Sequence, residues 1–200
     1  MSLGLLLIRA VFGLTLAAHG SQKLFGSFGG GGPAGTTTFF RSLGFRAPLL
    51  MAVVAGLGEL VGGLLFAFGL LTPLAALILT VVMLNAIATV HWKKGFFNSA
   101  GGYEFNLAII ATALAVTAIG PGRYSLDHAI GWAETISGRW WALEVVVLAA
   151  LIAFVTLTVG RTHTTPARPE EPAAPSNGRN PQTIRLGRPA EARPRKERAS

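Results

Sequence analysis

The chain of 200 residues contains no cysteine. This absence excludes a disulfide-stapled secreted domain, a resident disulfide exchanger, thiolate metal sites and covalent c-type haem attachment. Charge is also scarce, since only 13% of the residues are Asp, Glu, Lys or Arg, about half of the roughly 25% usual in soluble proteins. Residues 1–160 hold eight bases and five acids, too few to cover a water-facing surface. With 51% hydrophobic residues, the composition argues against a soluble enzyme and indicates a membrane protein.

Long apolar runs, in contrast, are abundant in the chain. A hydrocarbon core of about 30 Å requires roughly 20 helical residues, and five runs approach or reach that length: about 3–25, 48–71, 74–91, 104–119 and 141–159. The first run is not expected to be a signal peptide, because no positive region precedes it and Arg9 falls inside it. We therefore expect an all-α membrane protein with a transmembrane helical domain over residues 1–160.

Three other segments carry weaker signals. The glycine-rich run 26–35 lacks the Gly-Lys-Ser/Thr ending of a phosphate-binding loop and is expected to be a slack linker. Gly58 and Gly62 form a small-xxx-small pair that predicts close helix packing. Residues 161–200 hold nine bases, four acids and few large apolar side chains, so we expect a disordered basic tail. Such a tail suits anionic lipid head groups; nucleic-acid binding is not expected.

The distribution of bases predicts the orientation. Five spans place two loops and the whole tail on one side with 13 Lys and Arg, and leave two on the other side with the N-terminus. The side richer in bases should be cytoplasmic. The sequence therefore predicts a multi-pass plasma-membrane protein with its N-terminus outside and its tail in the cytoplasm.

Two charged residues, Arg9 and Glu59, lie well inside apolar runs, and an ionisable group costs about 2.5–3.5 kcal/mol at the bilayer centre. Glu59 falls at the middle of the second run, and Arg9 lies about 7.5 Å outward from the middle of the first. An Arg9–Glu59 pair would lower the insertion cost of both. Such a pair has two interpretations that the sequence leaves open: a proton relay, or an ion pair that only fixes helix register.

More polar residues gather at the expected cytoplasmic ends of the runs: His19, Lys23, His91, Tyr103, Glu104 and Asn106. If the ends meet, Lys or His can donate to a quinone carbonyl and a carboxylate can handle the proton, with His19 and Glu104 as the candidate catalytic residues. A b-type haem on His19 and His91 is a weaker alternative. Interfacial anchoring accounts for Lys93 and Lys94. We expect no metal and no tightly bound cofactor, with quinone as the one possible ligand.

These residues occur in an order that resembles the DoxX family of small bacterial membrane proteins. The resemblance covers about residues 3–130 and rests on Arg9, His19-Gly20-x-x-Lys23-Leu24-Phe25-Gly26, Glu59-Leu60-x-Gly62-Gly63, His91-x-x-x-Gly95-Phe96-Phe97, Gly102-Tyr103-Glu104 and Gly120-Pro121-Gly122-x-x-Ser125-Leu126-Asp127. It implies an antiparallel bundle of four transmembrane helices. The fifth run and the basic tail lie outside the family's core.

The resemblance also implies a redox context, because the family is named after a subunit of a thiosulfate:quinone oxidoreductase. Another member is linked to a complex with a superoxide dismutase and a thiosulfate sulfurtransferase. The leading hypothesis is therefore a membrane subunit of an oxidoreductase system, quinone-linked or concerned with oxidative stress and thiols. Two alternatives stay open: a scaffold for soluble redox enzymes, and a small-molecule or proton transporter. The sequence contains no self-sufficient catalytic motif, and a homo-oligomer is also open.

Overall fold

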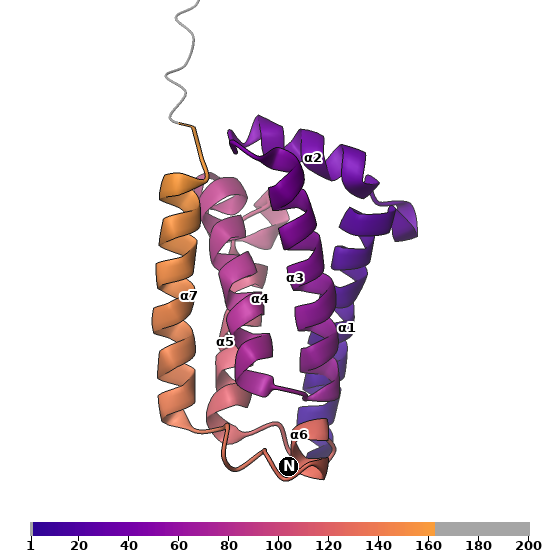
Figure 1. Cartoon of the computed structure of the whole chain (residues 1–200), viewed down its shortest axis with the longest axis vertical. Helices are drawn as coiled ribbons and strands as arrows, with labels where there is room; N and C mark the ends of the chain where they lie inside the picture. The colour runs from indigo at the N-terminus through magenta and orange to yellow at the C-terminus, as the bar shows by residue number, and fades with distance from the viewer. Residues whose placement is uncertain (1, 163–200) are drawn as a thin grey trace, which may run out of the picture. The chain divides into compact units, whose positions relative to one another are not determined.

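Five long helices that run alternately in opposite directions form the body of the protein. The computed structural model describes residues 2–162, and its helices are α1 (Ser2–Phe25), α3 (Pro48–Phe68), α4 (Thr72–Ala86), α5 (Glu104–Ile119) and α7 (Arg139–Val159). The N-terminus and the end of α7 consequently lie at opposite ends of the bundle (Figure 1). The expected all-α membrane fold is confirmed.

The lengths of the helices suit a bilayer. In the described residues, four helices are long and apolar enough to cross a membrane: Ser2–Phe25, Pro48–Phe68, Thr72–Lys94 and Arg139–Val159. The third combines α4 with a π turn, η2 (Ile87–His91), and a 3-10 turn, η3 (Trp92–Lys94). The fifth long helix, α5, has 16 residues and is about 24 Å long by the helical rise.

Proline and glycine set the boundary between α3 and α4. Gly69 ends α3 in the left-handed conformation at φ 62°, which glycine adopts without steric cost. Pro73 lies in the first turn of α4, where its missing N–H is not needed. The apolar runs 48–71 and 74–91 predict a break at residues 72–73, and the structure has it at residues 69–71.

The glycine-rich run does not form the slack linker that the sequence led us to expect. Residues Ser27–Gly29 make a 3-10 turn, η1, and α2 (Gly32–Ser42) follows at once. The helix lies across the end of the bundle (Figure 1). Pro33 sits in its first turn, and Thr36 donates a hydrogen bond of 3.3 Å to the carbonyl of Lys23. These local contacts order a segment whose composition suggests flexibility.

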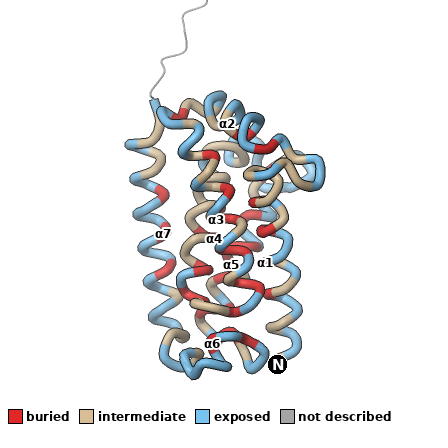
Figure 2. The backbone as a smooth tube through the Cα atoms, turned by 45° about the vertical axis from the view of Figure 1, so that its right-hand side comes forward, coloured by how far each residue is buried: buried red, intermediate tan, exposed pale blue. Residues whose placement is uncertain are grey.

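Glycines on two faces of α3 set the packing of the bundle. A Cβ added to Gly13 of α1 would lie 2.5 Å from the Gly63 carbonyl, and one added to Gly20 would lie 2.3 Å from the Leu60 nitrogen. The backbones of α1 and α3 therefore touch. On the other face, a Cβ on Gly62 would lie 2.8 Å from Ile78 of α4, which confirms the predicted close packing. Buried residues line the inner faces of these helices (Figure 2).

The end of α7 is fastened to the loop between α2 and α3. Arg161 donates two hydrogen bonds, of 3.1 and 2.9 Å, to the Leu43 carbonyl. The Arg46 N–H donates to Gly160 and the Thr162 N–H to Gly44, at 2.9 and 2.8 Å. We name these contacts the clasp. Arg161 and Thr162, which the prediction placed in the disordered tail, are therefore ordered, and the remainder of that prediction, residues 163–200, lies outside the described residues.

Candidate functional site

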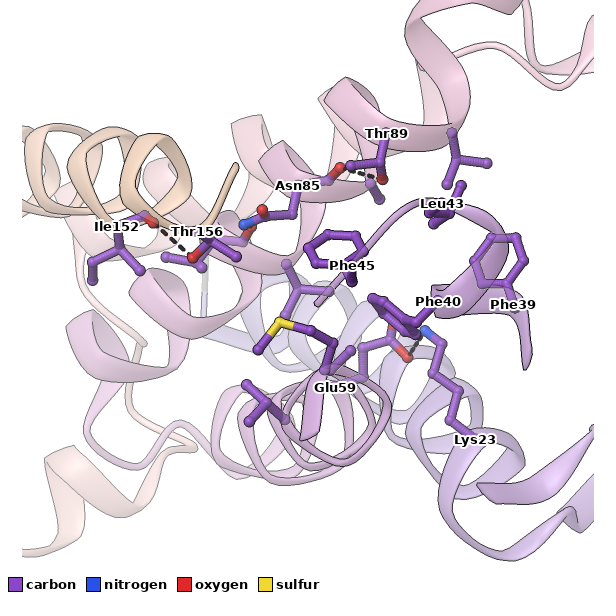
Figure 3. A pocket seen from close by; sticks show the side chains of 17 residues that line it. Lys23, Phe39, Phe40, Leu43, Phe45, Glu59, Asn85, Thr89, Ile152 and Thr156 are labelled. Atoms are coloured by element: carbon purple, nitrogen blue, oxygen red, sulfur yellow. Dashed lines mark hydrogen bonds and ion pairs between the residues drawn. The ribbon is translucent and has the colours of Figure 1, made fainter. Parts of the chain in front are cut away.

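A cavity of about 210 Å³ lies toward the end of the bundle where α2 crosses it. Its walls come from α3, α4 and α7, and Phe40, Leu43 and Phe45 cover it from the side of α2 (Figure 3). Most of the lining is aliphatic or aromatic. A cavity with apolar walls and few polar groups is the usual form of a small-molecule site.

An ion pair supplies the charge in this cavity. Lys23 Nζ in the last turn of α1 pairs with Glu59 Oε2 in the middle of α3 (Figure 3). The Glu59 side chain is 6% exposed and that of Lys23 is 30% exposed. The pair depends on the glycine contact between the helices, since a Cβ on Gly56 would lie 3.3 Å from the Lys23 Cβ.

The predicted Arg9–Glu59 pair is wrong. Gly13 meets Gly63 and Gly20 meets Leu60, so Glu59 lies at the depth of the last turns of α1. Arg9 is 14 residues from Lys23 on the same helix, about 21 Å away by the helical rise. The error arose because depth was estimated from the middle of each apolar run, whereas the glycines set the register.

Arg9 is buried at the opposite end of the bundle. Its guanidinium is fully buried and donates from Nη2 to the Tyr124 carbonyl. The negative charge of Asp127, on the short helix α6 (Leu126–Ala129), interacts favourably with the Arg9 guanidinium. Asp127 is itself fully buried. This arrangement removes Arg9 from the cavity and joins α1 to the segment that follows α5.

Asp127, which the sequence marks only as part of the family motif, has a structural role that was not predicted. Its carboxylate accepts hydrogen bonds from the backbone N–H groups of Leu71 and Thr72, at 2.7 and 2.9 Å. The Thr72 hydroxyl donates a third, at 2.6 Å. A carboxylate at a helix N-terminus satisfies free N–H groups and is favoured by the helix dipole. The cap comes from 55 residues away, so no local pattern reveals it.

The α4 wall of the cavity carries uncharged polar groups. Asn85 donates from Nδ2 to the Val81 carbonyl at 2.9 Å, and the Thr89 hydroxyl donates to the Asn85 carbonyl at 2.8 Å. Thr89 lies in the π turn η2, and single π turns occur often at functional sites. Thr156 of α7 also lines the cavity. None of these three residues stands out in the sequence, because each occurs within a long apolar run.

The other predicted site residues do not line the cavity. His91 Nδ1 lies 2.6 Å from the Gly101 carbonyl, and Tyr103 stacks on Trp92 with ring centroids 5.6 Å apart. Exposed Glu104 accepts a hydrogen bond of 3.0 Å from the Asn98 N–H. These contacts build the connection between η3 and α5. That loop includes the 3-10 turn η4 (Asn98–Ala100).

His19 and Asn106 lie apart from that connection. His19 is exposed and its Nδ1 lies 3.1 Å from the Gln22 side-chain oxygen. Asn106 is buried and donates to the Met83 sulfur at 3.3 Å. Of the eight residues predicted to form one polar site, the structure brings Lys23 and Glu59 into the cavity. No group of three or more His, Cys, Asp or Glu side chains able to hold a metal occurs within residues 2–162.

Comparison with known proteins gives a consistent assignment. A family model described as DoxX matches residues 4–92, which span α1 to the π turn and include Lys23, Glu59, Asn85 and Thr89. A Bacillus subtilis (strain 168) protein named "Putative oxidoreductase CatD" is 33% identical over 125 residues, covering 62% of this chain and 85% of that protein.

An uncharacterized membrane protein of Mycobacterium tuberculosis (strain ATCC 25618 / H37Rv) is 29% identical over 143 residues, covering 66% of this chain and 83% of that protein. No solved structure matches the chain significantly. The family match over the helices that hold the ion pair, and a relative covered over most of its length, show that this chain belongs to the DoxX family.

Proposed function

We propose that the protein is a membrane subunit of an oxidoreductase system and that its cavity holds the head group of a quinone-type molecule. The observation that carries the proposal is an apolar cavity of about 210 Å³ with one buried ion pair, Lys23–Glu59, on its wall. The name of the Bacillus subtilis relative, "Putative oxidoreductase CatD", supports the redox context.

The packing of the helices supports entry from the bilayer. Helices α3 and α7 each pack against α4 but scarcely against one another. Lining residues on both are exposed at the molecular surface, Val54 on α3 at 53% and Ile152 on α7 at 41%. This surface is apolar and faces lipid in a membrane, so a lipid-soluble molecule reaches the cavity without crossing water.

The two charged groups have separate roles in this proposal. The Lys23 ammonium donates a hydrogen bond to a quinone oxygen, and the Glu59 carboxylate passes on, one after the other, the two protons that accompany the two-electron reduction or oxidation. A partner protein that carries a redox group supplies or takes up the electrons. His19 and Glu104, the candidates from the sequence, are exposed and do not line the cavity, so the proposal transfers their roles to Lys23 and Glu59.

Bound quinone in the purified protein tests the proposal. The full-length protein is purified from native membranes in mild detergent, extracted with organic solvent, and its quinone content per protein is measured. The double variant Lys23→Met/Glu59→Gln removes both charges together and leaves no unpaired buried ion. We expect its quinone content to fall at least tenfold.

Glu104→Gln is the control, because it neutralises an exposed carboxylate away from the cavity. It should retain the quinone content of the wild type. Equal quinone in the double variant would contradict the proposed site. Absence of quinone from the wild-type protein would contradict the proposed function and favour the transporter or scaffold alternatives.

A further inference from the structure

The threonine hydroxyl groups on the cavity wall donate their hydrogens to backbone carbonyls. The Thr89 hydroxyl donates to the Asn85 carbonyl at 2.8 Å, and the Thr156 hydroxyl donates to the Ile152 carbonyl at 2.8 Å (Figure 3). A threonine hydroxyl has one hydrogen and two lone pairs. Toward a ligand in the cavity, both groups therefore act as acceptors.

The Asn85 amide presents an acceptor in the same region. Its Nδ2 donates to the Val81 carbonyl at 2.9 Å, and because a carbonyl only accepts, this bond fixes which end of the amide is oxygen. Asn85 Oδ1 is buried and has no hydrogen-bond partner among the described residues. A buried acceptor without a donor costs free energy, which a ligand hydroxyl would recover.

Glu59 adds acceptor oxygens from α3, across the cavity from Asn85 (Figure 3). Donor groups on the described lining are fewer: the Lys23 ammonium, which directs one of its three hydrogens to Glu59, and the second amide hydrogen of Asn85. Acceptors thus outnumber donors. A quinone has two acceptor oxygens and would oppose this pattern, whereas a hydroquinone donates two O–H groups and complements it.

We infer that the cavity binds the reduced, hydroxyl-bearing form of its ligand, a hydroquinone, more tightly than the quinone. This inference rests on the proposed function and adds the redox state of the ligand to it. Tighter binding of the reduced form raises the reduction potential of the bound couple, by about 30 mV for each tenfold difference in affinity of a two-electron couple.

Direct binding measurements separate this inference from the proposed function. The full-length protein in detergent is titrated calorimetrically under argon with a short-chain menaquinone analogue, with its reduced hydroquinone, and with the 1,4-dimethoxy derivative of the hydroquinone. We expect the hydroquinone to bind at least tenfold more tightly than the other two, because the dimethoxy derivative keeps the ring but lacks both O–H donors.

Two variants test the acceptors, and one serves as a matched control. Thr156→Val and Asn85→Leu should lower the preference for the hydroquinone over the quinone severalfold. Thr158→Val removes a hydroxyl that makes the same kind of bond, to the Phe154 carbonyl, outside the cavity, and should change neither affinity. Equal or tighter binding of the quinone would overturn this inference while the proposed function stands. Failure of all three compounds to bind would overturn both.

Discussion

Buried charges in this protein are held by partners from distant parts of the chain. Arg9 and Asp127 are fully buried at one end of the bundle, and Glu59, in the middle of α3, is nearly so. Each is expensive in a bilayer, and each has a partner that lowers the cost. These buried charges have two roles. The Lys23–Glu59 pair lies in the cavity and belongs to the proposed site, whereas Asp127 caps α4 outside the cavity and holds the fold.

Asp127→Asn should destabilise the protein. The change removes the negative charge beside Arg9 and weakens the cap on Leu71 and Thr72, because an amide presents one acceptor oxygen where the carboxylate has two. We expect a loss of about 3 kcal/mol, seen as a fall of roughly 5–10 °C in the melting temperature. Thermal unfolding in detergent measures it.

Glu134→Gln is the matched comparison, because Glu134 is exposed on the same connection. Its melting temperature should stay within about 1–2 °C of the wild type, as surface substitutions usually do. Similar melting temperatures for the two variants would show that the buried cap contributes little.

At the scale of helices, much of the fold could be predicted and the site only in part. The apolar runs predict all five long helices, with α3 ending at residue 68 where the sequence suggests 71. Helix α2 was missed because it begins inside the glycine-rich run 26–35, although Pro33 in its first turn is a start signal. Lys23 and Glu59 were predicted as site residues. Their pairing was not, since helix register depends on glycine contacts between chain segments.

Gly13→Ala should disturb the contact between α1 and α3. The added Cβ would lie 2.5 Å from the Gly63 carbonyl and 2.6 Å from the Ala67 nitrogen, both backbone atoms that cannot move alone. We expect the helices to separate at a cost of about 1–3 kcal/mol, and the Lys23–Glu59 pair to loosen with them. A lower melting temperature and lower quinone content would report the two effects.

Gly4→Ala provides the control on the same helix. No atom lies within 4 Å of the position of its Cβ, and alanine is favoured over glycine within a helix by about 0.5–1 kcal/mol. The variant should therefore be as stable as the wild type or slightly more stable. A comparable loss of stability in both variants would mean that glycine is required within the helix itself and not for the contact between α1 and α3.

At the scale of the whole bundle, the odd number of long helices within residues 2–162 places Ser2 and Thr162 at opposite ends of the bundle. The chain has no cysteine, so single cysteines can be introduced without removing any. With a membrane-impermeant maleimide on intact cells, we expect Glu134→Cys to be labelled and Ser42→Cys to react only after lysis. The expectation follows from the 13 bases against two on the two sides; the reverse labelling would invert the predicted orientation.

Removal of residues 165–200 separates the subunit from the scaffold hypothesis. The shortened chain keeps the clasp at Arg161 and Thr162. For a quinone-binding subunit we expect bound quinone to remain at the wild-type level. A scaffold that works through its tail should lose co-purifying soluble enzymes, such as the superoxide dismutase and sulfurtransferase that the family resemblance suggests, and mass spectrometry of the purified complex detects this loss.

The clasp joins the last described residues of the chain to residues that line the cavity. Leu43, which accepts the hydrogen bonds of Arg161, and Phe45, which lies 5.9 Å beneath its guanidinium, both line the cavity. The sequence beyond Thr162 continues directly from this point. If the cavity holds a quinone-type molecule as proposed, a displacement of Arg161 would also move Leu43 and Phe45 and so change how tightly that molecule is held.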